Sequence, residues 1–196
     1  MLRMVFAARA IATSMASCTL VVEEPDVSWP QLVDAVTDLQ TLLEKLGLKG
    51  FLKTTGGKGL HVVVPIRAAL TWEQAKRFTK AVAELFASTF PNRFVATLPK
   101  SKRKGRILID YLRNSQGATA IAPYGIRARR NAPVSTPVAW GELAQDLRFD
   151  YFNVNTIPDR LSRLRQDPWH DFAGTWQTLT SSMFKQVGIK AGVHGD

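Results

Sequence analysis

The feature that most constrains the fold is the stretch 53–65, KTTGGKGLHVVVP, which predicts two strands joined by a glycine loop. In the second strand the apolar even-numbered residues fall on one face, whereas His61 falls on the other. Glycines at three of four consecutive positions remove the Cβ atoms that would keep a phosphate from the backbone. They also allow positive φ angles, so that N–H groups can converge on one anion. Lys58 adds a positive charge to this loop, and Thr55 adds a hydroxyl.

The residues alone leave two interpretations of the loop open. It is either an anion pocket suited to a triphosphate or a nucleic-acid phosphate, or a flexible hairpin loop with a solvated lysine. The spacing departs from the P-loop pattern G-x-x-x-x-G-K-[ST], and no helix pattern follows it. An ordinary nucleotide-hydrolase site is therefore excluded.

The charge of the chain favours a polyanionic partner. Its 196 residues carry a formal net charge of +10, and residues 100–130 hold nine basic residues against the single acid Asp110. Such a stripe suits nucleic acid first and an anionic membrane second, and the alternative is a solvated basic face. A hydrophobic content of 45% supports a packed core, and the single Cys18 excludes an internal disulfide and fits a reducing cytoplasm.

The chain divides into three expected parts. Residues 1–22 are atypical: two arginines, small apolar residues and no acid in the first 20 positions resemble a targeting segment, or upstream sequence misjoined to a domain. Their apolar run is interrupted by Arg9 and is too short to span a bilayer. Residues 23–177 are expected to form the main domain, and residues 178–196 a tail or linker.

Periodicity and capping residues predict the main elements. Ser28 with Gln31 begins a helix that Gly47 ends, and Thr71 with Gln74 begins a second helix. We expect strands at 51–54, 60–66, 94–97, 106–111 and 119–123, and a further helix from residue 137. The strands 60–66, 106–111 and 119–123 are predicted to share one sheet in an α/β (α+β) fold.

Asp110 stands at the end of an apolar strand and has two interpretations. It is either a metal ligand at a strand end, or a cap for the following turn that also pairs with Arg113. The residues alone favour the cap. Arg127, in the segment after 119–123, suits a bidentate grip on phosphate.

Three segments together carry a family resemblance: KTTGGKGLHVVVPI, ATLPKSKRKGRILIDYLRNSQGATAIAPYGIRAR and TPVAWGEL. In this order and spacing they resemble the primase-polymerase domain of the bacterial ATP-dependent DNA ligase D of non-homologous end joining. The resemblance runs from about residue 27 to 172. It implies an archaeo-eukaryotic primase-like mixed sheet flanked by helices, apparently truncated at the N-terminus.

The resemblance also implies roles for individual residues. Thr55 and His61 match the positions that contact the incoming triphosphate, and Arg113 and Arg127 match basic nucleotide contacts. Lys58 would add its charge to the same site. Asp110 matches one of three aspartates that hold two divalent metals, Mn²⁺ or Mg²⁺, and the resemblance therefore reverses the preference for a cap.

One departure from the family lies upstream of the first helix. The family carries Asp-x-Asp-Pro there, and the corresponding positions are near Leu20 and Val22, which cannot bind a metal. The nearby acids Glu23, Glu24 and Asp26 fit the motif poorly. Because two-metal transfer needs several carboxylates, enzyme activity is uncertain.

Two functions follow from the resemblance and its departure. The first is a ribonucleotide-preferring polymerase that acts at double-strand breaks, impaired by the missing motif. The second is a non-catalytic nucleotide- and DNA-binding remnant, and a decayed reading frame is a third possibility. The expected partners are DNA ends, nucleoside triphosphates, a ligase module and a Ku-type end-binding protein, in the bacterial cytoplasm and without a membrane.

Overall fold

A mixed six-stranded sheet forms the centre of the protein in a computed structural model that describes residues 16–23, 27–57, 59–67, 70–97, 99–143 and 151–189. The strand order is β4-β5-β1-β3-β2-β6. Only the β4–β5 pair is parallel among the named pairs, and the others are antiparallel. The strands are β1 (Ala16–Glu23), β2 (Phe51–Thr54), β3 (Gly59–Ile66), β4 (Phe94–Val95), β5 (Ile107–Asp110) and β6 (Pro137–Val138).

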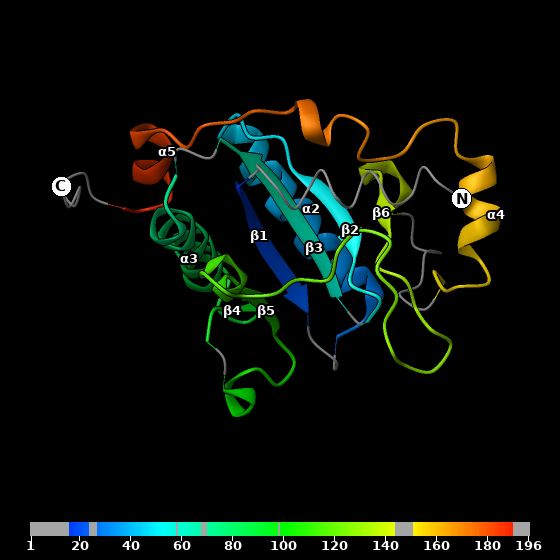
Figure 1. Cartoon of the computed structure of the whole chain (residues 1–196). Coiled ribbons are helices and arrows are strands. Elements are labelled where there is room, and N and C mark those ends of the chain that lie inside the picture. The colour runs from blue at the N-terminus through cyan, green and yellow to red at the C-terminus, as the bar shows by residue number, and fades with distance from the viewer. Residues whose placement is uncertain are drawn as a thin grey trace.

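Two long helices flank this sheet and begin where the capping residues predict (Figure 1). Before α2 (Trp29–Lys45), Gln31 Oε1 accepts a hydrogen bond from Ser28 N at 2.8 Å. Before α3 (Trp72–Thr89), the Thr71 hydroxyl accepts from Gln74 N at 3.2 Å. The shorter helices are α4 (Ile157–Arg163) and α5 (Ser181–Gln186), with 3₁₀ turns at Lys100–Lys102, Leu112–Asn114, Trp140–Glu142 and Phe172–Gly174.

The main core lies between the sheet and these two helices. Along β3 the even-numbered residues from Leu60 to Ile66 are at most 2% exposed and belong to this core, as their alternation predicts. Leu39 of α2 and Phe78 of α3 pack into the same cluster. The odd-numbered residues of β3 face the other way, and that second face carries the candidate site.

The central strand β1 is the main feature that the sequence did not predict. It pairs with β3 from Ala16↔Ile66 to Glu23↔Gly59 and with β5 at Val21↔Asp110. The sheet therefore crosses the boundary that we expected at residue 22. A central strand buried in a core lacks the strict alternation of a half-exposed strand, so its run of small and apolar residues looked like a targeting segment. Residues 1–15 lie outside the described residues.

Two expected elements are wrong. Residues 119–123 form no strand: Thr119 and Ala120 are exposed, and the carbonyl of Ile121 accepts from a lysine side chain instead of a strand neighbour. The expected helix from Pro137 is the edge strand β6 followed by a 3₁₀ turn. Proline is tolerated there because an edge strand pairs on one side only.

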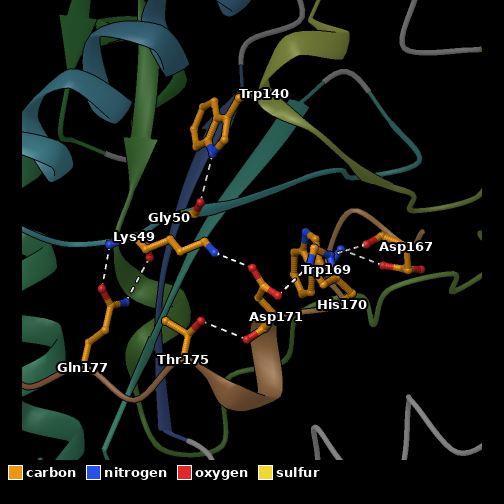
Figure 2. A network of polar contacts seen from close by, with 9 residues as sticks. All are labelled: Lys49, Gly50, Trp140, Asp167, Trp169, His170, Asp171, Thr175 and Gln177. Atoms are coloured by element: carbon orange, nitrogen blue, oxygen red, sulfur yellow. Dashed lines mark hydrogen bonds and ion pairs between the residues drawn. The ribbon is translucent and has the colours of Figure 1, made fainter. Parts of the chain in front are cut away.

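Residues 167–177 form a strap across the second face of the sheet (Figure 2). Trp169 stacks on Phe172 at 4.7 Å between ring centroids, and its indole N–H donates to Leu52 O at 2.8 Å. Lys49 forms an ion pair with Asp171 at 2.8 Å at the edge of the strap. Both aromatic residues are buried, and together with Phe51 and Val63 they form a second small core.

The chain after the strap continues to pack on the domain. Leu179 and Val187 are buried in the main core, and the Phe184 ring packs edge-on against Phe78 at 5.5 Å. Residues 178–189 are thus part of the domain, whereas we expected a separate tail to begin at residue 178. Within the described part of the chain, none of the helices is both long and apolar enough to cross a membrane.

Candidate nucleotide-binding site

The candidate site is built on one row of residues that crosses the second face of the sheet. The strand register pairs Asp110 with Val21, Val21 with His61, and His61 with Lys53. Directly paired residues project to the same face of a sheet. Asp110, His61 and Lys53 therefore share the face opposite to the helices, although they come from distant parts of the sequence.

His61 is a buried, neutral imidazole in this row. It is 5% exposed, and its Nδ1 atom is buried without a hydrogen-bond partner among the described residues. Burial, as the larger cause, and the positive charges of Lys53, Arg113 and Arg127 together lower the pKa of His61 to about 2. These three cations therefore converge on His61, which stays uncharged near pH 7.

Lys53 was not predicted as a site residue, and it lies at the end of this row. Its side chain is 3% exposed, and its Nζ atom donates to Ile121 O at 2.8 Å and to Ser135 Oγ at 3.0 Å. Burial, together with the nearby charge of Arg127, lowers the pKa of Lys53 to about 7. The sequence did hold a signal for Lys53 as a site residue. Neighbouring strand residues point to opposite faces, so Lys53, next to the apolar Leu52, is expected on the same face as His61.

The glycine loop is packed closely by arginine side chains. A Cβ atom on Gly56, where φ is +63°, would lie 2.9 Å from Arg127 Cγ. A Cβ atom on Gly57 would lie 3.0 Å from a terminal guanidinium nitrogen of Arg129 and 3.3 Å from the hydroxyl oxygen of Thr55. The glycines thus admit arginines to the loop, whereas the sequence suggested that they make room for a phosphate. Lys58 lies outside the described residues.

Thr55 closes the neck of the glycine loop. Its hydroxyl accepts from Gly59 N at 3.3 Å, and its own backbone N–H donates to Gly59 O at 3.1 Å. The side chain is buried, at 6% exposure. The hydroxyl therefore lies beside the arginines at the mouth of the loop.

Asp110 makes the contacts that the cap interpretation predicted. It is 7% exposed, its Oδ1 accepts from Leu112 N at 2.8 Å, and its Oδ2 lies 3.5 Å from Arg113 Nε. Arg113 also donates to Thr119 O at 3.3 Å, which holds its guanidinium over the strand end. The Asp110 carboxylate therefore caps the turn that follows β5 and orients Arg113, one of the three cations near His61.

The two positions near which the resemblance predicts the family's other aspartates lie on the opposite face of the sheet. Leu20 and Val22 are 2% and 1% exposed and belong to the main core beneath the helices. The β1 residue in register with Asp110 is Val21. Among the described residues, no three His, Cys, Asp or Glu side chains gather closely enough to hold a metal ion.

A cavity of about 370 Å³ lies elsewhere, beside α2 and the start of β5. Asp34, Asp38 and Arg93 contribute to its lining, and Asp38 already forms an ion pair with Arg93 at 3.0 Å. None of the predicted site residues that the structure describes lines it. The convergence of cations on His61, and not the size of this cavity, therefore marks the candidate site.

The fold and the site thus define an α+β domain in which three basic side chains act on a buried, neutral histidine. The sequence model of the LigD primase-polymerase domain matches residues 24–169, and the chain belongs to that family. The family predicted from the sequence is thus confirmed, as is the mixed sheet flanked by helices.

Two curated relatives and one solved structure illustrate the similarity. The chain is 41% identical over 166 residues to the multifunctional non-homologous end joining protein LigD of Pseudomonas aeruginosa, covering 84% of this chain and 20% of the relative. It is 30% identical over 141 residues to the bifunctional LigD of Bacillus subtilis, covering 71% of this chain and 23% of the relative.

A solved structure, the polymerase domain of Mycobacterium tuberculosis Ligase D in complex with DNA, superposes with a TM-score of 0.76 at 27% identity. The match covers 83% of this chain and 56% of that chain. The present chain therefore spans about a fifth of the curated relatives and little more than half of the solved domain.

Proposed function

We propose that this chain binds a nucleoside triphosphate and a DNA end in bacterial double-strand-break repair, with little or no nucleotidyl transfer of its own. The observation that carries the proposal is the convergence of Lys53, Arg113 and Arg127 on the neutral His61. A triphosphate carries several negative charges, and it would replace this repulsion between cations with attraction. The net charge of +10 and the solved relative's complex with DNA support a DNA partner.

In this proposal the triphosphate lies over the glycine loop. Arg113 and Arg127 donate to its oxygens, Lys58 adds charge, and Thr55 and His61 supply neutral hydrogen-bonding groups. The exposed basic residues on either side guide the DNA end by long-range attraction. A ligase module and a Ku-type protein would be its partners in the cytoplasm.

The proposed lack of catalysis rests on the carboxylates. A two-metal transfer needs several carboxylates to hold two ions about 3.5–4 Å apart. Asp110 is a single carboxylate and is already engaged with Leu112 and Arg113, while Leu20 and Val22 are apolar. These residues do not fit a pair of divalent ions, so no metal-dependent step is assigned to this chain.

The second candidate function is an active, ribonucleotide-adding polymerase. The acids Glu23, Glu24 and Asp26 favour it, because Glu23 is the last residue of β1 and the other two follow it closely in sequence. Mn²⁺ or Mg²⁺ would then be held by Asp110 together with one of these acids.

Two assays on the whole chain separate these functions. Calorimetry with ATP should detect binding that Arg127→Ala weakens and that Arg163→Ala, an exposed arginine on α4, leaves unchanged. Primer extension with Mn²⁺ and ribonucleotides should give the same background level for the chain and for Asp110→Ala. Strong extension that Asp110→Ala abolishes would establish the polymerase instead.

A further inference from the structure

Lys53 is a buried charged residue that the family resemblance does not assign. It occupies the β2 end of the site row, directly opposite His61. Its side chain is almost entirely buried, and both of its hydrogen bonds go to segments far away in sequence. A buried ammonium is costly unless it is well bonded, so its placement calls for a physical reason.

Those hydrogen bonds reach both sides of one small unit, the arginine hairpin, which we define as residues 124–135. Ile121, whose carbonyl accepts from Lys53, lies just before the hairpin, and Ser135, whose hydroxyl accepts from Lys53, ends it. Ser135 Oγ in turn donates to Thr54 O at 2.7 Å. The lysine and this serine therefore fasten the two legs of the hairpin to β2.

Backbone bonds carry this attachment to the arginines. Tyr124 N donates to Ser135 O at 2.6 Å, Ser135 N donates to Gly125 O at 2.9 Å, and Arg127 N donates to Pro133 O at 2.8 Å. The aliphatic part of the Arg127 side chain lies against Gly56 of the glycine loop. A shift at the neck of the hairpin would thus move the Arg127 guanidinium relative to the glycine loop.

We propose that Lys53 is a positioning residue that fastens the arginine hairpin over the glycine loop and acts on the nucleotide through Arg127. This inference rests on the proposed nucleotide binding. It assigns Lys53 no contact with the nucleotide.

The charge of Lys53 gives this role a measurable pH dependence. The charged or titratable groups that interact with Lys53 are His61 on β3 and Arg127 on the hairpin. Arg113 and Asp110 lie beyond His61 along the site row. Tyr124, at the neck of the hairpin, donates its hydroxyl proton to Asp167 at 2.5 Å. With a pKa of about 7, Lys53 is largely neutral above that pH in the free protein. A bound triphosphate favours the ammonium form, so binding takes up a proton and affinity falls as the pH rises.

The first experiment is calorimetry with ATP between pH 7.5 and 9, where phosphate groups with a second pKa of about 6 are already ionised. We expect Lys53→Met to bind ATP roughly tenfold more weakly at pH 7.5, the cost of about one weakened charge-assisted bond at Arg127. The control Lys49→Met removes an equal charge from an exposed lysine on the strap side and should leave affinity unchanged. Wild-type affinity should fall across this range, whereas Lys53→Met should give a flat profile.

A second measurement needs no nucleotide. Hydrogen exchange of the Tyr124 and Arg127 amides should be faster in Lys53→Met, while the β3 amides keep their protection. Ser135→Ala removes the hydroxyl that bridges Lys53 and Thr54, and it should speed exchange of the same two amides. It replaces Lys53→Met as the test variant if that protein does not fold. In Arg127→Ala, adding Lys53→Met should cost little further ATP affinity, because Lys53 acts through that arginine.

The outcomes separate this inference from the proposed function. Unchanged hairpin exchange in both variants overturns the positioning role, even where ATP affinity falls. Unchanged ATP affinity and pH profile in Lys53→Met also overturn it. A third outcome is that wild type does not bind ATP, although the hairpin amides exchange faster in the variants. In that case the proposed nucleotide binding is wrong, and Lys53 only fastens the hairpin.

Discussion

Val22→Asp tests which face of the sheet position 22 occupies. The resemblance predicts an aspartate near this position, so the substitution would look like a repair of the expected Asp-x-Asp-Pro motif. In the structure, however, Val22 is 1% exposed in the main core, in register with Leu60 and Ile109. An aspartate there would enter the apolar layer under the helices and would lie on the opposite face from Asp110.

The expected destabilisation is large. Losing the buried valine side chain costs about 2 kcal/mol. Burial raises the pKa of such a carboxyl by about 3 to 5 units, which at pH 7 adds about 4 kcal/mol because each unit is worth about 1.4 kcal/mol. Together they come to about 6 kcal/mol, comparable to the whole stability of many domains. At pH 5 the carboxyl is mostly protonated when folded, so the loss should be about 3 kcal/mol smaller.

Urea unfolding followed by circular dichroism at pH 7 and pH 5 measures this difference. The matched control is Val22→Thr, which keeps the shape and adds only a hydroxyl, at a cost of about 1–2 kcal/mol with little pH dependence. A strand that slips by one residue turns every side chain to the other face. If Val22→Asp is as stable as Val22→Thr and Mn²⁺ raises its melting temperature, β1 has the slipped register and the reasoning is refuted.

Three further predictions concern the site and its support. Arg127→Ala should weaken ATP binding by about 10- to 100-fold and reduce its salt dependence, because one charge-assisted bond is lost; equal affinity in calorimetry would remove Arg127 from the site. The folded pKa of His61 lies below its unfolded value of 6.5, so the unfolded chain binds more protons between about pH 2 and 6.5, and stability falls as pH drops through that range. His61→Gln should remove about 2 kcal/mol of the loss between pH 6.5 and 4.5 in urea titrations, and an unaltered slope would exclude this titration. Asn114→Ala should cost about 3 kcal/mol in the same assay, because the buried Asn114 amide pairs with both Thr19 N and Thr19 O; a cost below 1 kcal/mol would contradict this pairing.

Local sequence patterns were sufficient to predict the elements that are specified by residues close together in the sequence. The two capped helices and the strands flanking the glycine loop appear where expected, because capping side chains and alternation act over a few residues. The confirmed family also rests on motifs that can be read from the chain. The approach of Arg127 to His61 was anticipated only through that resemblance.

The elements that the sequence missed depend on distant partners. Strand β1 is defined by its pairing with β3 and β5, and β6 by its pairing with Leu52 and Lys53 of β2. Residues 119–123 have strand-like composition, but Lys53 binds the Ile121 carbonyl instead of a neighbouring strand. Lys53 itself is an ordinary strand lysine in the sequence, and its burial is set by segments about 70 and 80 residues away.

The two edge strands β4 and β6 have only two residues each. A sheet edge of this length offers too few unpaired N–H and C=O groups to template another strand, and Pro137 removes one donor from β6. Other copies of the chain, in a crowded or partly unfolded population, therefore find little edge on which to add a strand and begin a fibril. Docking of a repair partner by strand addition is disfavoured for the same reason, and such a partner would have to bind through side chains and loops.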